Sequence, residues 1–375
     1  MTQAFEVQSP RSPVAAIHQR LGATIVSRDG WSVPANYGDI LFEYAAVRER
    51  GAGLSDLSSR GRIIVSGSEA VQFLNGLITN DMKTLAVNSW MPAAFPSVQG
   101  RLIASVRVVR LKDAGKNVTP TFLLDTEAAT HERVLQTIER FTLAGDFRVT
   151  DVTSQTALLS LQGTDAAAFI RSVIGNEAAD VGANQVVIQS WHAAELTIMR
   201  ASHTGAEGFD VVVDSPQAGV VWDALHGAGA RPVGFDALEL LRIEAGVPRY
   251  GVDMDDTNVV PETNLDDAVS YTKGCYVGQE IIARIKYRGH VAKKLTGLVF
   301  AEPAQLAAGA LIKASDAKEV GRITSVTYSP HLGRTIALGY LKYDYLQPDT
   351  NVLVGGDDAE IPAQVTALPF VGSVR

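Results

Sequence analysis

The residues best suited to chemistry lie in one short segment, which reads Lys-Gly-Cys-Tyr-Val-Gly-Gln-Glu over residues 273–280. Cys275 within it is the only cysteine of the 375 residues. A cysteine attacks an electrophile or binds a metal as the thiolate, and nearby cations favour that form. Lys273 precedes Cys275 by two residues, and Arg284 follows in a stretch with two further cations. We therefore interpret Cys275, Lys273 and Arg284 as a candidate catalytic group; the alternative is that Cys275 serves only as a small apolar side chain.

The other residues of this segment would shape the loop that carries the thiol. Gly274 and Gly278 allow a tight, exposed turn because glycine tolerates backbone angles that other residues avoid. Tyr276 lies between them, and Gln279 and Glu280 would orient the loop or contact a partner. Glu280 has a simpler alternative role as an acid in the first turn of a helix, where the helix dipole favours negative charge.

Composition limits the class of protein. A chain of 375 residues with 46% hydrophobic residues exceeds what one core usually organises, so we expect two or three domains. The net charge of -8 argues against broad nucleic-acid binding. A single cysteine excludes an internal disulfide. Residues 1–20 lack the apolar core of a signal peptide. No apolar run approaches the length of about 20 residues that a membrane-spanning helix needs. We expect a water-soluble cytoplasmic protein with no membrane partner, and a monomer because no coiled-coil pattern is present.

An internal repeat indicates how the chain is organised. Residues 63–78 and 158–174 each read as a short apolar strand that ends at a glycine and leads into an amphipathic helix. Ser68 and Thr164 occupy the position expected of a helix N-cap in the two copies. We interpret the copies as two related α+β lobes; the alternative is two unrelated strand-helix units with similar capping residues.

Two further segments complete the prediction of elements. Residues 236–245 predict a helix that Asp236 caps and Gly246 ends, with Glu239 and Arg242 one turn apart, the spacing of an ordinary ion pair. From about residue 295, short β-rich runs separated by turns predict a small all-β domain. The stretch 284–294 carries five Lys or Arg residues and would connect this domain to the lobes.

Several common site chemistries are missing from the sequence. Residues 253–264 begin like a calcium loop but lack its glycine and its final glutamate. There is no dinucleotide fingerprint, phosphate-binding loop, nucleophile elbow or zincin helix, and the seven histidines have no metal-ligand spacing, so we predict no metal site. His290 could serve Cys275 as a base, which keeps a cysteine hydrolase open, although a solvated connector histidine is the simpler interpretation.

Five motifs are spread along the chain: Trp31-x-x-Pro34, Leu54 to Ser58, Leu77 to Asp81, Leu241 to Gly246 and Gly321 to Ser325. Together they resemble the folate-dependent aminomethyltransferase superfamily of the glycine cleavage T-protein. The resemblance covers about residues 30–345. Within it, residues 273–289 are similar to the signature of the YgfZ branch, whose members are folate-binding proteins that support iron-sulfur enzymes and tRNA modification.

The resemblance implies an α+β fold of three domains arranged as a cloverleaf, with two related α+β lobes and a C-terminal β-barrel around a central folate-type channel. The implied first lobe comprises residues 1–52 and 146–252, and the second comprises residues 53–145 and 253–290. The implied barrel comprises residues 291–375. The internal repeat and the β-rich C-terminal part agree with this arrangement.

The resemblance also implies a ligand, tetrahydrofolate or a one-carbon derivative, and assigns roles where this chain matches the family motifs. Arg242 corresponds to an arginine near the folate, where a guanidinium could hold the glutamate tail or a ring carbonyl. Residues 203–210 resemble Tyr-Thr-Gly-Glu-x-Gly-Phe-Glu, whose last acid binds pterin nitrogens. Asp210 inherits that role, with His203 in place of the tyrosine and Glu207 within the run; alternatively, Asp210 is a capping or strand-end acid.

One difference between this chain and the family motifs bears on which function is possible. Aminomethyltransferases place an aspartate that acts in proton transfer in the strand after Gly100, and this chain reads Arg-Leu-Ile-Ala-Ser there, which disfavours the T-protein reaction. The leading hypothesis is a folate-binding accessory protein that assists iron-sulfur cluster assembly or repair in client enzymes, including tRNA-modifying ones. Cys275 would share a cluster transiently with a client or carrier protein. The alternatives are a tetrahydrofolate-dependent aminomethyl or methyl transferase, and an interaction module whose 284–294 stretch docks an acidic partner.

Overall fold

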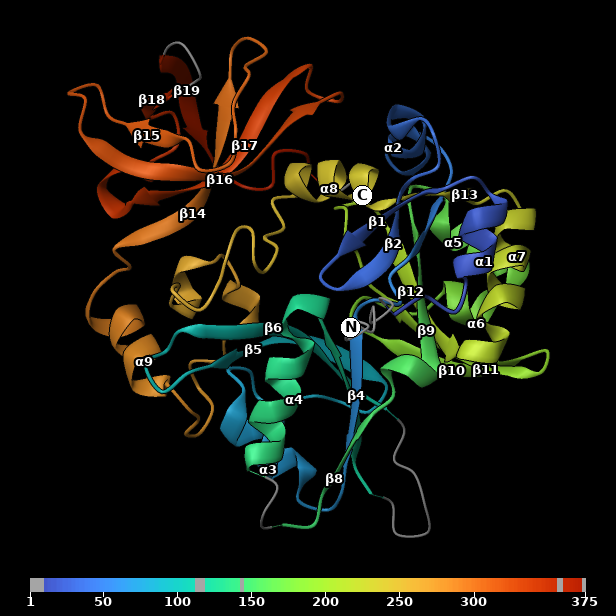
Figure 1. The fold of residues 1–375 in the computed structure, drawn as a ribbon. Helices are drawn as coiled ribbons and strands as arrows, with labels where there is room; N and C mark the ends of the chain where they lie inside the picture. Colours follow the sequence, from blue (N-terminus) through green and yellow to red (C-terminus); the bar gives the residue numbers. More distant parts are fainter. Residues whose placement is uncertain (1–9, 112–118, 142–144, 356–359, 373–375) are drawn as a thin grey trace, which may run out of the picture.

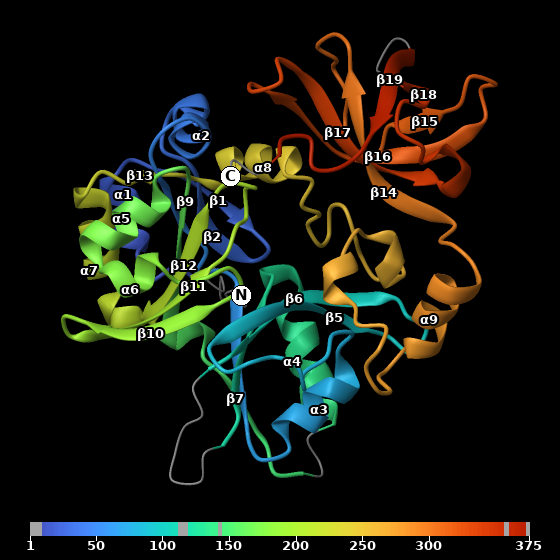
Figure 2. The same ribbon diagram turned by 180° about the vertical axis from the view of Figure 1, so that it is seen from behind.

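The computed structural model describes residues 10–111, 119–141, 145–355 and 360–372. The fold is α+β: two lobes are each built around their own sheet, and a β-barrel follows at the C-terminal end (Figure 1). The reverse view shows the three bodies arranged around a common centre, with the chain after α8 (Phe235–Glu244) passing between them (Figure 2). This arrangement confirms the predicted fold class.

The first lobe contains a six-stranded sheet whose strands come from distant parts of the sequence. Neighbouring strands are antiparallel except β13 and β3, which run parallel. Trp222 and Phe209 are fully buried in its core. The strand order is β10 (Val186–Trp191), β11 (Ala194–Arg200), β12 (Gly208–Asp214), β9 (Thr156–Gln162), β3 (Gly53–Asp56) and β13 (Arg231–Pro232). The lobe also contains the hairpin β1 (Thr24–Arg28) and β2 (Trp31–Asn36), and helices α1 (Ala15–Arg20), α2 (Ile40–Arg48), α5 (Ala166–Val173), α6 (Asn176–Ala179) and α7 (Ala218–Gly227).

The second lobe contains a five-stranded antiparallel sheet. Phe95 and Phe122 are fully buried in its core, which α3 and α4 cover on one face. The strand order is β5 (Ser89–Pro96), β6 (Leu102–Arg110), β7 (Thr121–Thr126), β4 (Gly61–Ser66) and β8 (Arg148–Asp151); the helices are α3 (Ala70–Leu77) and α4 (His131–Arg140). Short 3-10 turns occur at Ala128–Thr130, Thr153–Gln155, Ser215–Gln217, Val260–Glu262, Asp266–Ala268 and Tyr343–Tyr345.

The chain crosses twice between the two sheets, close to the expected lobe boundaries. β3 belongs to the six-stranded sheet, so the first crossing falls between Asp56 and Gly61 rather than at residue 53. β8 belongs to the five-stranded sheet, so the return falls between Asp151 and Thr156 rather than at residue 146. Residues 1–9 and 373–375, which the expected boundaries include, lie outside the described part of the chain.

The predicted repeat is present as the units β4–α3 and β9–α5. Each strand is followed by a glycine with a strongly positive φ, Gly67 at 145° and Gly163 at 142°. A Cβ at either position would meet a backbone oxygen, that of Asp146 at 2.1 Å or that of Gly51 at 2.6 Å, so only glycine fits. The predicted caps are wrong: residues 69 and 165 precede the two helices, and neither makes a side-chain cap hydrogen bond. Ser68 instead donates to the carboxylate of Asp146.

The barrel closes through pairing of its first and last strands. Its order is β14 (Lys293–Phe300), β17 (Arg334–Lys342), β16 (Glu319–Ser329), β15 (Leu311–Lys313), β18 (Asn351–Gly355) and β19 (Glu360–Thr366), and β19 pairs with β14. The connector to it contains α9 (Gln279–Arg288). α8 begins one residue before the predicted Asp236, with Gly234 at the N-cap, and ends before Gly246, whose φ is 67°. In the described residues, no helix is long and apolar enough to span a membrane.

One buried carboxylate ties α8 to both the first lobe and the barrel. Glu244 accepts hydrogen bonds from the hydroxyl of Tyr44 and the guanidinium of Arg48 in α2, and from the hydroxyl of Ser329 in β16. The side chain of Glu244 is fully buried. The C-terminal end of α8 is therefore a fixed junction, and the residues one turn earlier face the space between the lobes.

Candidate functional site

A cavity of about 270 Å³ lies where the two lobes face each other, and we call it the central cavity. The first lobe contributes the β1–β2 turn and the loop between β11 and β12, and the second contributes β5, β6 and the residues after β7. α8 and the chain that follows it form a further wall. Every wall therefore depends on the relative placement of elements that are far apart in the sequence.

The central cavity combines apolar walls with an excess of positive charge. Trp90 and Phe235 supply aromatic surface, and Leu57 and Leu238 add aliphatic surface. Five arginines face three carboxylates: Arg28, Arg60, Arg107, Arg242 and Arg249 against Asp29, Glu127 and Glu239. The Nε atoms of Arg242 and Arg249 are buried without a hydrogen-bond partner in the described structure. Arginine side chains beside aromatic surface suit an acceptor such as a carboxylate next to a flat apolar group.

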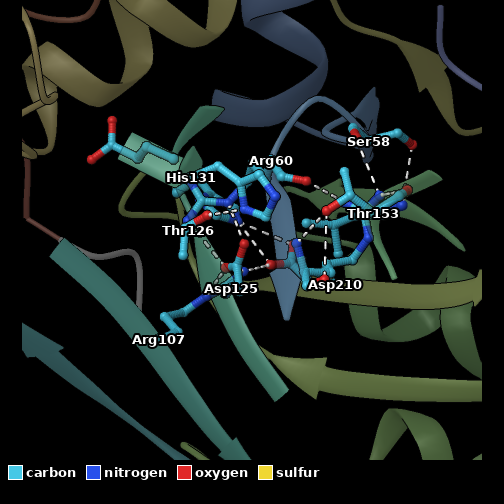
Figure 3. A network of polar contacts seen from close by, with 12 residues as sticks. Ser58, Arg60, Arg107, Asp125, Thr126, His131, Thr153 and Asp210 are labelled. Carbon is cyan, nitrogen blue, oxygen red and sulfur yellow. Dashed lines mark hydrogen bonds and ion pairs between the residues drawn. The ribbon is translucent and has the colours of Figure 1, made fainter. Parts of the chain in front are cut away.

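A buried network of ion pairs fixes the wall formed by β6 (Figure 3). Arg107 Nη2 lies 2.6 Å from Asp125 Oδ2 in β7 and 2.5 Å from Asp210 Oδ2 in β12. Arg60 Nε donates to Asp125 Oδ1 at 2.7 Å. Because β12 belongs to the first lobe and both β6 and β7 to the second, the guanidinium of Arg107 joins the two sheets. Two carboxylates hold it in one orientation at the cavity wall.

The structure places Asp210, the acid implied to bind a pterin, behind this wall rather than on it. Its carboxylate is fully buried and lies 2.9 Å from His203 Nε2 as well as against Arg107. Burial opposes ionisation, but the charges of His203 and Arg107 outweigh it and lower the pKa of Asp210 well below the usual aspartate range. His203 and Arg107 line the cavity themselves. Asp210 therefore positions the two groups that a ligand would touch.

Arg242 lies on the cavity wall and also forms structural ion pairs. One nitrogen of its guanidinium binds the carboxylate of Asp253, and another binds Glu239 one helical turn earlier. It also donates to the hydroxyl of Ser325 in the barrel at 2.7 Å. The alternative pairing with Glu239 is thus present, and it does not remove Arg242 from the cavity, because its Nε remains without a partner.

Glu207 lies apart from the central cavity. Its carboxylate is paired with Arg200, and both side chains line a second pocket on the other side of Trp90. The structure thus brings His203, Asp210 and Arg242 to one region and leaves Glu207 outside it.

The strand after Gly100 supplies no carboxylate to the cavity. β6 alternates between faces, and its cavity-facing positions include Ser105 and Arg107, whereas Ala104, Val106 and Val108 point into the core of the second lobe. A different acid lies in the cavity. Glu127 follows β7, is partly buried, and accepts a hydrogen bond from the backbone N–H of Tyr250 at 3.1 Å. Burial raises the pKa of Glu127, while Arg60 and the Tyr250 N–H act in the opposite direction.

The segment around the thiol lies at the outer edge of the second lobe, next to the β5–β6 turn (Figure 1). Cys275 is exposed, and so are Glu280 and Arg284. Gly278 has φ 75° and immediately precedes α9, where a Cβ would lie 2.3 Å from the carbonyl oxygen of Ser97. Gly274 has open space around it. The segment does not line the central cavity, so the thiol and the proposed ligand site are separate surfaces.

Lys273 anchors this segment instead of facing solvent beside the thiol. Its ammonium donates to the carbonyl oxygens of Asn75, Ile78 and Asn80 at 2.6–2.8 Å, at the C-terminal end of α3. Burial lowers the pKa of Lys273 to about 8, and Asp81 acts in the opposite direction. Tyr276 is buried, with its ring 4.9 Å from the Lys273 nitrogen, and Gln279 is the first residue of α9. Lys273 and Tyr276 thus fix the backbone on both sides of the exposed Cys275.

Sequence reasoning did not single out Arg60, Trp90, Arg107 or Glu127. The two arginines and Glu127 follow or interrupt apolar strands, a pattern that is typical of strand edges in any protein. The signal that could have identified Arg107 is its spacing from Ser105, since residues two apart in a strand share a face. No local signal links Arg107 to Asp210, because 103 residues separate them.

Comparisons with known proteins agree with this fold. The chain matches the family model of the GCVT N-terminal domain over residues 14–273, and that of the glycine cleavage T-protein C-terminal barrel domain over residues 293–372. The chain therefore belongs to the glycine cleavage T-protein family. Two curated relatives, both named aminomethyltransferase, come from Rubrobacter xylanophilus and Thermotoga neapolitana. The first is 32% identical over 96% of this chain and 94% of its own length, and the second is 29% identical over 97% and 99%.

A solved structure supports the same fold. The crystal structure of glycine cleavage system aminomethyltransferase T from Bartonella henselae superimposes with a TM-score of 0.89 and covers 97% of this chain and 98% of its own. The sequence identity is 23%, so this likeness establishes the architecture of two lobes and a barrel and not a shared activity.

Proposed function

We propose that this protein binds a reduced folate in the central cavity and transfers a one-carbon unit, as an aminomethyl or methyl group, to or from it. The observation that carries the proposal is the cavity itself, in which aromatic walls adjoin an excess of arginines over carboxylates. A reduced folate has the matching chemistry, because it joins a flat heterocycle to a tail that ends in carboxylates. The curated relatives, which carry the name aminomethyltransferase, support a transferase.

The described residues fit such a ligand at both ends. Trp90 and Phe235 offer faces for its rings, and the polar side chains of His203 and Glu127 can meet ring nitrogens. Arg242 and Arg249 line the cavity and supply positive charge for its carboxylates. Bound tetrahydrofolate would supply nitrogen atoms that accept or release a one-carbon unit. The protein would hold these atoms in place and exclude water from them.

A pair of ligands tests the assignment of the arginines. Replacing Arg249 by Gln should weaken binding of 5-formyltetrahydrofolate about tenfold or more, but should change binding of the matching pteroate, which lacks the glutamate tail, less than about threefold. Arg284→Gln is the matched control, because it removes one exposed cation far from the cavity. Equal losses for both ligands would contradict the placement of the tail. If no reduced folate binds the unaltered protein, the pocket is vestigial and an interaction module becomes the better account.

A second candidate function is the one implied by the YgfZ-like segment, an accessory role in iron-sulfur cluster assembly or repair. The observation that favours it is the exposed Cys275 on a loop that the buried Lys273 holds rigid, together with the missing acid on β6. The partners would be iron-sulfur client enzymes or cluster carrier proteins, and the exposed cations of α9, such as Arg284, would contact them.

A cell-based assay separates the two candidates. Cells that lack the native copy are given the Cys275→Ser variant or, as a control in the same loop, Thr272→Ser, at equal abundance. Loss of activity of an iron-sulfur tRNA-methylthiolating enzyme in the first variant alone would support the accessory role. Full activity with Cys275→Ser would exclude the thiol from that role. Transfer of a one-carbon unit from an aminomethyl donor to tetrahydrofolate by the purified protein would support the transferase.

A further inference from the structure

Three carboxylates line the central cavity, and only one is suited to exchange a proton. Glu239 forms ion pairs with Arg28, Arg242 and Arg249. Asp29 lies in the exposed turn between β1 and β2. Glu127 is partly buried, and its one hydrogen bond in the described structure comes from the Tyr250 backbone, which leaves its second oxygen without a protein donor. The three carboxylates therefore have different environments within one cavity.

We propose that Glu127 is the residue that exchanges a proton with a nitrogen of the ligand in the central cavity. It would take the place of the aspartate that the family resemblance implies for β6. This inference rests on the proposed folate-dependent transfer. The geometry supports it because Glu127 enters the cavity from the end of β7, adjacent to β6 in the same sheet, so an acid from the neighbouring strand reaches the same space.

The surroundings of Glu127 favour its protonated form. The charged groups that face it are Arg60 from the β3–β4 link, Asp29 from the β1–β2 turn and Asp125 from β7. The two acids disfavour a further negative charge, and burial does the same, so the pKa of Glu127 is raised despite Arg60 and the Tyr250 N–H. Asp125 is already committed to Arg60 and Arg107, so it cannot replace Glu127 as a proton carrier.

This one carboxyl group accounts for both proton transfers of the reaction. Glu127 in its acid form donates its proton to the nitrogen that departs as the old C–N bond breaks. The resulting carboxylate takes a proton from the nitrogen that forms the new C–N bond. The two transfers cancel, the carbon keeps its oxidation state, and no oxidant or reductant is needed.

Two variants test the inference with a readout besides turnover. Glu127→Gln keeps the shape of the side chain but cannot release a proton, and Glu127→Asp keeps the acid on a shorter side chain. Glu132→Gln, on the exposed face of α4, is the matched control. The protein is labelled with ¹³C-glutamate, and its carboxyl resonances are followed as the pH changes. The resonance that is absent from the spectrum of Glu127→Gln belongs to Glu127, and its change with pH gives the titration of that carboxyl group. We expect it to titrate above the usual value of about 4.3 and to shift when 5-formyltetrahydrofolate is added.

The outcomes separate this inference from the proposed function. We expect Glu127→Gln to bind 5-formyltetrahydrofolate within about threefold of the unaltered protein, yet to transfer a one-carbon unit about 100-fold more slowly in a single turnover, with Glu127→Asp in between. Normal binding with unchanged transfer, or a carboxyl that titrates at or below 4.3, would overturn the role of Glu127 and leave the folate site standing. Failure of the unaltered protein to bind any reduced folate would overturn the proposed function, and this inference with it.

Discussion

At the scale of the residue, the site uses carboxylates in two different ways. Asp125 and Asp210 are buried against guanidinium groups and act as fixed anions that orient Arg107. Glu127 is partly buried without such a partner, which leaves it able to change protonation state. A carboxylate in direct contact with a guanidinium thus serves as a scaffold, whereas the carboxylate of Glu127, which forms no such ion pair in the described structure, is the one proposed to carry a proton.

Removing one scaffold carboxylate should destabilise the whole protein. Asp210→Asn leaves the Arg107 charge less compensated in a buried site, so we expect the free energy of unfolding to fall by about 3 kcal/mol. Because its pKa is lowered in the folded state, Asp210 stabilises the protein above the usual aspartate pKa, and this contribution is lost as the pH falls below about 4. The difference in the free energy of unfolding between the variant and the unaltered protein should therefore become smaller in acid. Urea titrations at several pH values would measure it.

The control for this prediction is an exposed ion pair. Asp223→Asn removes the partner of Arg20, and both side chains are at least half exposed, so its cost should stay below about 1 kcal/mol. Similar losses for the two aspartates would mean that the buried network does not hold the lobes together.

Glu127 should have the opposite pH dependence. Its pKa is raised in the folded state, so its contribution to stability is present at low pH and is lost as the pH rises through the folded-state pKa. Glu127→Gln should therefore match the unaltered protein most closely below the usual glutamate pKa of about 4.3, and should be the more stable of the two at higher pH. The same urea titrations measure this. If the difference in the free energy of unfolding between the two proteins stayed constant across that pH range, Glu127 would titrate normally.

At the scale of the element, the two glycines of the thiol segment have different roles, although the sequence suggested one role for both. Gly278→Ala should cost about 2 kcal/mol or more, because φ is 75° and the new Cβ would meet the carbonyl oxygen of Ser97 at 2.3 Å. Gly274→Ala should change stability by less than about 0.5 kcal/mol, because nothing lies within 4 Å of its Cβ position. Thermal unfolding of the two variants side by side measures this contrast, and equal destabilisation would refute it.

Local pattern predicted the elements well and their ends less well. The repeated strand-glycine-helix unit, the helix that ends before Gly246 and the β-rich C-terminal part are all in the structure. The predicted caps Ser68 and Thr164 failed because Gly67 and Gly163 turn the chain sharply, so each helix begins two residues after the predicted cap. Capping depends on the backbone path, which residue type alone does not determine.

At the scale of the whole molecule, the site exists only where distant segments meet. Arg242 and His203 could be predicted for the cavity through the family resemblance, but their contacts with Ser325 and Asp210 depend on the packing of α8 and of the two sheets. The spacing of Arg107 from Ser105 could have placed it on the cavity face, but its ion pairs with Asp125 and Asp210 could not be predicted, since a buried ion pair leaves no local pattern. Cys275 was predicted to be exposed, and it is, but its neighbour Lys273 is committed to the end of α3.

Isothermal titration with 5-formyltetrahydrofolate shows directly whether the cavity between the lobes binds a reduced folate. Ser105→Phe would fill the cavity from β6, and Ser172→Phe places the same bulk on the exposed face of α5. We expect micromolar binding, about -8 kcal/mol, in the unaltered protein and in Ser172→Phe, and at least about a tenfold loss in Ser105→Phe. Absence of binding in the unaltered protein, or equal binding in both variants, would contradict the claim.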